Sequence, residues 1–329
     1  MRPIRYGDRR QVLTSVSDTT LILAPPMRRY FQIQGSGVQY NIQLPNALYM
    51  KVGDALVFEN ASPEIVGVQN SSLATWERVP PRWSITCTLQ QNATAAGVWG
   101  VFWSPNPMLK NGGFSTIDFT GMLLANNIQS ESSRVVATSS GSVVQNPSAD
   151  PSDGQGVARL RASNVGNYAL AYESQYMVLG GGCRRYNYKA SRSVANSAIH
   201  EFTSRFGLGS NVVGGAHVNG VYFVNDLTAW GNFWVTRTIA AAGGNTTNIS
   251  AVVPAVYPSW DMLSFEINST GVRADFFIGT SLLFTHSVAA NIPAVPVANG
   301  FGLTKIAGAL SGDLYVEYAE SGSYPTTQR

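Results

Sequence analysis

The chain has 329 residues, of which 12% are charged and 44% hydrophobic, and its formal net charge is +3. The hydrophobic fraction excludes a largely disordered protein, and the small net charge gives no reason to expect a nucleic-acid partner. No apolar run approaches the ~18 residues of a membrane span, so no membrane insertion is expected. At this length we expect about two domains, because single cores stop growing at roughly 250–300 residues.

The chain begins with a basic arm, residues 1–10, in which four arginines face a single acidic residue, Asp8. The arginines are Arg2, Arg5, Arg9 and Arg10. Arginine presents a planar fork of donors that suits carboxylates, so the arm is interpreted as a docking segment for another protein. The next apolar run, residues 21–24, is too short for the h-region of a signal peptide, which predicts synthesis and retention in a reducing cytoplasm.

Short strand-like segments fill the chain as far as residue 103, and each ends in a turn signal. They are residues 31–33, 40–44, 55–59, 65–68, 84–89 and 97–103. With no helical period between them, they predict a small β-sandwich or barrel. Pro- and Gly-rich stretches at 104–107 and 111–113 mark a boundary. We therefore expect an N-terminal β module over 1–107 and a second domain over 108–329.

Residues 260–286 carry the clearest pattern of the second domain. Leu263, Phe265 and Ile267 alternate with polar residues, and the alternation resumes after each of two turns. A period of two means that one face of each strand is buried. The segment predicts a three-strand antiparallel meander, and the chain as a whole is expected to be all-β, with a β-sandwich as its larger domain.

Aromatic residues are the strongest candidates for a binding site, because exposed Trp and Tyr rings stack on sugars. Two groups stand out: Tyr186 and Tyr188 beside Arg184 and Arg185, and the pair Trp230 and Trp234. The first group is expected on the surface, since Arg is rarely buried unpaired. For the two tryptophans the alternative is that they fill the core.

Paired carboxylates are the feature that a glycoside hydrolase requires. The chain has no Glu-x-Asp. Glu317 and Glu320 are three residues apart, which places them on opposite faces of a regular strand. Glu266 and Asp275 would face each other across the meander, where they are interpreted as polar cover on a solvated face. No catalytic residue is assigned, and the chain is predicted not to be an enzyme.

Metal and cofactor chemistry has little support in the sequence. The three histidines are scattered, and Cys87 and Cys183 lie far apart without a metal-ligand spacing. Both cysteines are predicted to be buried as small hydrophobes. No cofactor and no metal site is assigned, although calcium held by backbone carbonyls stays open.

Both halves of the chain resemble modules of bacteriophage structural proteins. The N-terminal half is similar to a small β module of tail-fibre and virion-surface proteins, and the C-terminal half resembles concanavalin-like jelly rolls. The matching stretches are residues 18–21, 42–45, 52–60 and 94–99, followed by 220–226, 232–237, 260–268, 276–279 and 314–318.

The resemblance implies a structural protein of a phage virion, made in the host cytoplasm. A tail fibre or tail appendage is expected first, docked to tail or capsid proteins by its N-terminal module and presenting the jelly roll to a host-surface glycan. By resemblance it would be a homotrimer. The alternatives are a capsid decoration or head-fibre protein and, from another class, a polysaccharide depolymerase.

Overall fold

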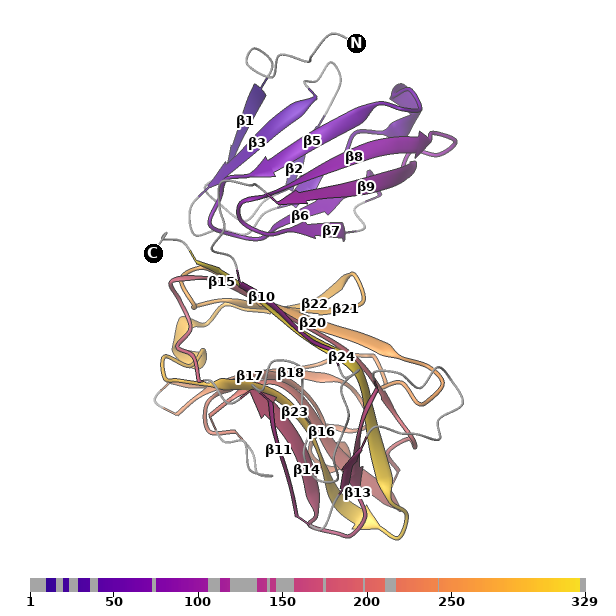
Figure 1. Ribbon diagram of the computed structural model, residues 1–329, viewed down its shortest axis with the longest axis vertical. Helices are drawn as coiled ribbons and strands as arrows, with labels where there is room; N and C mark the ends of the chain where they lie inside the picture. Colours follow the sequence, from indigo (N-terminus) through magenta and orange to yellow (C-terminus); the bar gives the residue numbers. More distant parts are fainter. Residues whose placement is uncertain are drawn as a thin grey trace.

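The computed structural model describes residues 10–15, 20–23, 29–35, 41–72, 75–105, 113–118, 135–140, 143–145, 157–173, 176–197, 199–210, 217–241 and 243–325. These residues form two β-sandwiches, one above the other in Figure 1. We refer to them as the N-terminal sandwich, strands β1–β9, and the C-terminal sandwich, strands β10–β24.

Two sheets make up the N-terminal sandwich, with the orders β1-β3-β5-β8-β9 and β2-β4-β6-β7. The strands are β1 (Arg10–Ser15), β2 (Thr20–Ile22), β3 (Tyr30–Gly35), β4 (Asn41–Gln43), β5 (Ala55–Asn60), β6 (Val66–Gln69), β7 (Thr75–Val79), β8 (Trp83–Gln91) and β9 (Val98–Pro105), with a 3₁₀ turn η2 (Ala47–Tyr49). A core of its own lies between the sheets, where the Phe31 and Phe58 rings stack 5.3 Å apart. Each expected strand is present, and β1, β2 and β7 are additional.

In the described residues of the C-terminal sandwich there are fifteen strands. They are β10 (Gly113–Asp118), β11 (Val135–Ser140), β12 (Val143–Gln145), β13 (Ala158–Ala162), β14 (Tyr168–Glu173), β15 (Gly182–Arg192), β16 (His200–Gly209), β17 (Gly220–Asn225), β18 (Val235–Ala240), β19 (Gly244–Ile249), β20 (Asp261–Ile267), β21 (Ala274–Ile278), β22 (Ser281–His286), β23 (Ala298–Gly308) and β24 (Gly312–Pro325). A short helix α1 (Leu227–Trp230) follows β17, and a 3₁₀ turn η3 (Ala289–Asn291) follows β22. The chain is all-β with a jelly-roll sandwich, which confirms the predicted fold class.

One sheet of this sandwich, here called the proximal sheet, faces the N-terminal sandwich (Figure 1). Its order is β12-β13-β24-β15-β20-β21-β22, with β10 also paired to β24. The distal sheet has the order β11-β14-β23-β16-β17-β18-β19. The antiparallel pairs β20–β21 and β21–β22 form the meander that the sequence predicts.

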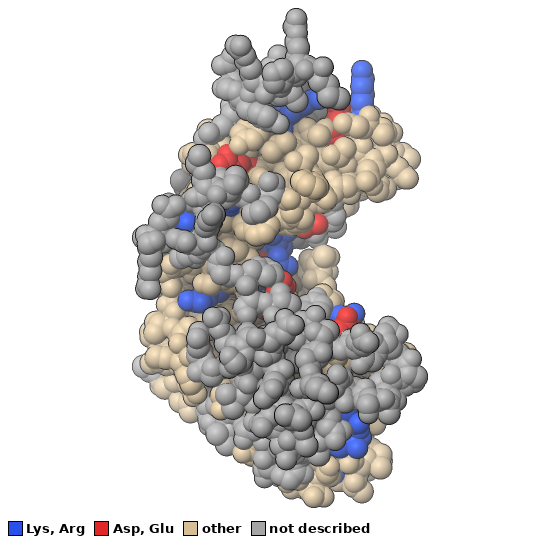
Figure 2. Space-filling model, viewed as in Figure 1, with Lys and Arg blue, Asp and Glu red and all other residues tan. Residues whose placement is uncertain are grey.

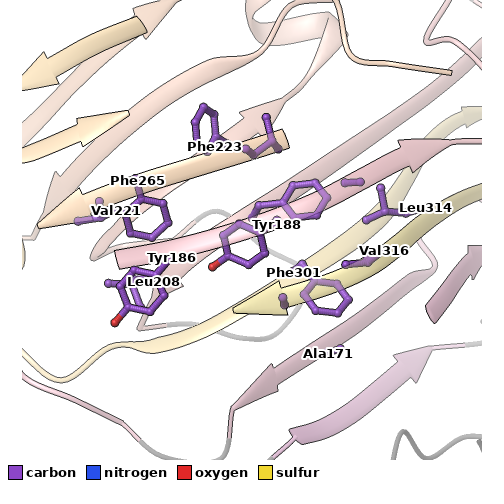
Figure 3. Close-up of a cluster of buried hydrophobic side chains, with 14 of the residues drawn as sticks. Ala171, Tyr186, Tyr188, Leu208, Val221, Phe223, Phe265, Phe301, Leu314 and Val316 are labelled. Carbon is purple, nitrogen blue, oxygen red and sulfur yellow. The ribbon is translucent and has the colours of Figure 1, made fainter. Parts of the chain in front are cut away.

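Aromatic rings from both sheets fill the space between them. Figure 3 shows Tyr186, Tyr188 and Phe265 of the proximal sheet lying against side chains of the distal sheet such as Phe301. Tyr186 stacks on Phe265 with ring centroids 4.8 Å apart, and Phe206 of β16 meets Trp234 edge-on at 5.8 Å. Such pairs add stability beyond the apolar area that they bury.

The two sandwiches are joined by a buried interface of mixed character. Its apolar part contains Ile65 and Trp83 on one side and Cys183 and Tyr324 on the other. Its charged part is centred on Arg78 of β7, whose guanidinium forms a two-pronged ion pair with the carboxylate of Glu266 on β20 (Nε to Oε1 3.0 Å). A two-pronged Arg–carboxylate pair fixes orientation as well as distance, so the interface holds the two sandwiches in one arrangement.

A second contact crosses the same interface. The Glu64 carboxylate accepts hydrogen bonds from the backbone N–H of Ser269, at 3.0 and 3.2 Å, and from its hydroxyl. Burial raises the pKa of Glu64, and the Ser269 donors oppose that rise. This contact lies outside the Arg78–Glu266 pair and offers a matched comparison for it.

We expect the buried His286 to make the fold sensitive to acid. Burial lowers its pKa from an ordinary 6.5 to about 4, while Thr236 and Thr238 hydroxyls contact its two ring nitrogens at 2.9 and 3.2 Å. Below pH ~6.5 the unfolded chain binds a proton that the folded chain takes up only near pH 4, so stability falls as the pH drops through this window, by up to about 3 kcal/mol. Denaturant unfolding at pH 7 and 4.5 should show a steeper loss in the wild type than in His286→Gln. Equal losses in the two proteins would contradict this role.

Candidate functional site

The outer face of the proximal sheet carries the best candidate site. Strand β15 buries Tyr186 and Tyr188, so the residues between and beside them face outward. The group that we call the β15–β24 face consists of Asn187, Lys189, Trp260, Glu317 and Glu320. It combines carboxylates, an amide, an ammonium and an indole on one surface.

A β-bulge in strand β24 brings the two glutamates to the same side. The residues of β24 that point into the core are Leu314, Val316 and Ala319, and the pairing with β15 shifts its register between Lys189 and Ala190. A bulge inserts one extra residue and so reverses the alternation beyond it. Both Glu317 and Glu320 contact outward-facing side chains of β15. The expectation that they lie on opposite faces was therefore wrong.

Each carboxylate has a partner on β15. The ammonium of Lys189 forms an ion pair with Glu317, whose side chain is 39% exposed. The side-chain N–H of Asn187 donates to Oε2 of Glu320 at 2.6 Å. Asn187 and Lys189 are alternate residues of one strand, about 7 Å apart along it. The two carboxylates are thus held next to each other along β24.

Aromatic side chains border this pair of carboxylates. Trp260 comes just before β20, and the Lys189 ammonium lies 5.5 Å from its ring centroid. Further along the same face the rings of Tyr257 and Tyr315 meet at 5.9 Å. Trp and Tyr rings at the surface of a sheet offer flat apolar faces to a sugar ring. None of these three residues was a candidate in the sequence.

Two arginines bind an aspartate of β24 close to Tyr315. Asp313 accepts hydrogen bonds from Arg159 at 2.9 Å and from Arg161 at 2.7 and 2.8 Å. Burial raises the pKa of the Asp313 carboxyl, and the Arg161 guanidinium opposes that rise. Two arginines on one aspartate leave an excess of positive charge beside Tyr315.

The aromatic residues predicted to bind sugars lie elsewhere. Tyr186, Tyr188 and Trp234 are 1%, 0% and 2% exposed, and all three belong to the core. Their polar atoms are satisfied inside: Tyr186 donates to the Met177 sulfur at 2.9 Å, and the Trp234 N–H donates to Asp261 at 2.7 Å. The prediction of a surface group around Tyr186 and Tyr188 is corrected, because burying two large rings outweighs exposing them beside arginines.

The remaining predicted residues are separated from one another. Arg184 and Arg185 are consecutive on β15 and so point to opposite faces. Arg185 faces outward, 3.8 Å from Glu266 and 3.1 Å from the Asn187 side-chain oxygen. Trp230 lies on the outer face of the distal sheet, under the guanidinium of Arg237 at 5.4 Å. Only Arg185 borders the β15–β24 face.

Glu266 and Asp275 do face each other across the meander, as the sequence predicts. They are not polar cover on a solvated face, however, because the N-terminal sandwich covers them: Glu266 is 1% exposed and pairs with Arg78. Burial raises the pKa of Asp275, against the effect of Arg273 at 3.2 Å. Both carboxylates are engaged in the interface.

Of the arginines predicted for docking, Arg2, Arg5 and Arg9 lie outside the described residues, and Arg10 begins β1. The last residue of the predicted arm is therefore the first residue of a strand. Both cysteines are buried and unpaired, as predicted, and burial raises the pKa of each thiol. Among the residues that the structure describes, no cluster of His, Cys, Asp or Glu could hold a metal ion, and no helix is long and apolar enough to cross a membrane.

No family model and no curated protein sequence matches the chain. Solved structures share its fold at low identity. The Emp47p carbohydrate recognition domain has a TM-score of 0.45 at 9% identity, covering 63% of this chain and 94% of its own. The Crh5 transglycosylase gives 0.44 at 12%, covering 65% and 85%. A LamA from Zobellia galactanivorans, solved with laminaritriose and laminaritetraose, gives 0.36 at 12%, covering 52% and 79%.

These structures are similar in fold only, but they include a transglycosylase as well as a carbohydrate recognition domain. The prediction that the chain is not an enzyme is corrected on a feature of the chain itself. It had depended on the absence of two carboxylates on one face, and the bulge in β24 removes that premise.

Proposed function

We propose that the chain binds a polysaccharide on the β15–β24 face and cleaves it with Glu317 and Glu320. The observation that carries this proposal is the bulge in β24, which brings two carboxylates to one face, where Lys189, the partner of Glu317, lies against Trp260. Glycosidic bond cleavage needs an acid at the leaving oxygen and a second carboxylate that acts as base or nucleophile.

The partners of the two glutamates suggest their roles. Glu317 is paired with the Lys189 ammonium and is assigned as the base or nucleophile. Glu320 contacts the neutral amide of Asn187 and is assigned as the acid.

A reducing-end assay tests the proposal. The purified chain is incubated with a panel of soluble glycans, namely laminarin, dextran, chitin oligosaccharides, capsular polysaccharide and lipopolysaccharide O-chains. New reducing ends are expected from at least one member, and proton NMR of the fresh product distinguishes inversion from retention at the anomeric carbon. Binding without any new reducing ends would leave a recognition face and remove the catalytic part of the proposal.

Replacement of Trp260 by Ala should weaken glycan binding while leaving the fold nearly unchanged. Trp260 is only partly buried and lies outside the core. Stacking of a sugar ring on its indole contributes on the order of 1 kcal/mol to binding. A loss of affinity of roughly 5- to 30-fold is expected by glycan array or calorimetry. Trp230→Ala, on the distal sheet, is the matched control and should bind normally. Equal losses in both variants would place the site elsewhere.

The biological setting that we propose is a phage virion, with the chain as a tail appendage or, alternatively, a head decoration that meets host-surface glycans. The support for this setting is the resemblance of both sandwiches to modules of phage structural proteins. A homotrimer is part of the same proposal, and light scattering checks it.

Deletion of residues 1–9 is expected to leave a folded, soluble protein that no longer joins the particle. The deletion stops before Arg10, because β1 pairs with β3 from that residue onward. The measurement is incorporation of tagged protein into virions, with the melting temperature as the check on folding. Normal incorporation of the truncated protein would remove the docking role of the arm.

A further inference from the structure

A chain of polar contacts runs from the N-terminal sandwich to the β15–β24 face. It begins with Arg78, which holds Glu266, and Arg185 lies 3.8 Å from the same carboxylate. The Arg185 Nε–H donates to the Asn187 side-chain oxygen at 3.1 Å, and the Asn187 side-chain N–H donates to Glu320 at 2.6 Å. We call these five residues the Arg78–Glu320 chain.

Asn187 is the member whose orientation matters most. Its amide has an acceptor end and a donor end, and only the donor end can bind a carboxylate. Arg185 occupies the acceptor end, which turns the N–H toward Glu320. If Arg185 were absent, the amide would be free to rotate by 180° and present oxygen to the carboxylate. Arg185 therefore determines how Glu320 is held.

Arg185 in turn depends on the N-terminal sandwich. Its side chain is 29% exposed, and the Glu266 carboxylate beside it is fixed from the other side by the two-pronged contact with Arg78. Glu77, next to Arg78 on β7, also interacts with Arg185: burial raises the pKa of Glu77 and the Arg185 charge lowers it. Strand β7 thus places one cation and one carboxyl group around Arg185. Figure 2 shows a hollow on one side of the molecule between the two sandwiches, where the proximal sheet faces β7.

We propose that the N-terminal sandwich is a positioning part of the glycan site, acting through Arg78, Glu266 and Arg185 on the Asn187 amide and so on Glu320. This inference rests on the function proposed above for Glu320. It gives the N-terminal sandwich a role in the reaction besides docking. In this arrangement Arg78, Glu266 and Arg185 act through Asn187, so they are positioning residues.

The test uses the whole chain and two readouts. The first is the pair of side-chain amide proton signals of Asn187, assigned with Asn187→Asp. The second is cleavage of whichever panel glycan the wild type degrades. The variants are Arg185→Gln, which interrupts the chain at its centre, and Arg78→Lys, which keeps the charge but loses the two-pronged contact. Glu64→Gln is the control, because it alters the other contact of the same interface.

In Arg185→Gln and Arg78→Lys the Asn187 signals should move, and kcat should fall roughly 10- to 100-fold with KM within about twofold, as for a displaced catalytic group. In Glu64→Gln both readouts should match the wild type. Unchanged Asn187 signals in both variants overturn the proposal, and so does an equal shift in Glu64→Gln, which would point to general loosening of the interface.

The two readouts keep this inference separate from the proposed function. If the wild type cleaves no glycan, the proposed function fails and the Asn187 signals alone decide whether the chain of contacts exists. If cleavage is present and the signals do not move, the function stands and the positioning role is refuted.

Discussion

Glu320→Gln is expected to reduce glycan cleavage by about 10²–10⁴-fold, the usual contribution of a general acid. The substitution removes the proton that the leaving oxygen requires and keeps an oxygen that accepts from Asn187. The fold and the affinity for glycan should therefore stay close to those of the wild type. Glu317→Gln should show a loss of similar size, because the base or nucleophile is removed. The measurement is the rate of reducing-end release under saturating glycan.

The matched control is Glu201→Gln on the distal sheet. The Glu201 carboxylate accepts from the backbone N–H of Thr228 at 3.0 Å at the start of α1, away from the β15–β24 face. Its variant should cleave at the wild-type rate. If Glu320→Gln and Glu317→Gln both cleave glycan at the wild-type rate, the reaction occurs at another site.

Arg78→Ala is expected to lower the free energy of unfolding by about 3–5 kcal/mol, because it leaves the carboxylate of Glu266 buried without its main partner. Burial lowers the pKa of Arg78 and the Glu266 charge raises it, and the net direction is upward. The Arg78 guanidinium also lies 5.0 Å from the ring centroid of Phe277, so packing is lost as well. Denaturant titration measures the change.

Arg29→Ala provides the comparison from the same sandwich. Arg29 pairs with Asp54 at 2.7 Å, but its side chain is 73% exposed, and such pairs contribute at most about 1 kcal/mol. Arg29→Ala should therefore unfold almost as the wild type does. An Arg78→Ala protein as stable as the wild type would mean that the Arg78–Glu266 pair does not stabilise the interface.

The strands were readable from the sequence because their signals are local. Alternation at Leu263, Phe265 and Ile267 and the turns at Gly271 and Gly279 define the meander without any distant contact, and both glycines have positive φ, at 74° and 59°. The same local signals predicted six strands of the N-terminal sandwich. The burial of both cysteines followed from a different argument, the absence of any metal-ligand spacing around them.

Which face of a strand is buried was harder to infer. Residues 184–189 alternate with a period of two, but this pattern does not say whether the tyrosines face the solvent or the core. The neighbouring arginines led to the prediction that they face the solvent, which was wrong. The structure buries Tyr186 and Tyr188 because the distal sheet supplies rings such as Phe206, at 5.5 Å from Tyr188. A rule that put the larger apolar surface inside would have turned Asn187 and Lys189 outward, toward the site.

The candidate site itself depends on two features that no local pattern contains. The bulge in β24 arises from the pairing of β24 with β15, which is distant in the sequence. The hydrogen bond from Asn187 to Glu320, for example, joins residues 133 positions apart. The contact of Arg78 with Glu266 spans 188 residues and turns a seemingly solvated carboxylate into a buried one. Strand pairing of this range is set by the whole fold.

The indole N–H signals of the tryptophans test the central claim most directly, because they report where a glycan binds. The chain is titrated with oligosaccharides from the panel glycan that it binds, and the signals are assigned by single substitutions. The account predicts a saturable shift of Trp260 with no shift of Trp230 on the distal sheet or of Trp234 in the core. A shift of Trp230 with Trp260 unchanged would contradict a glycan site on the β15–β24 face.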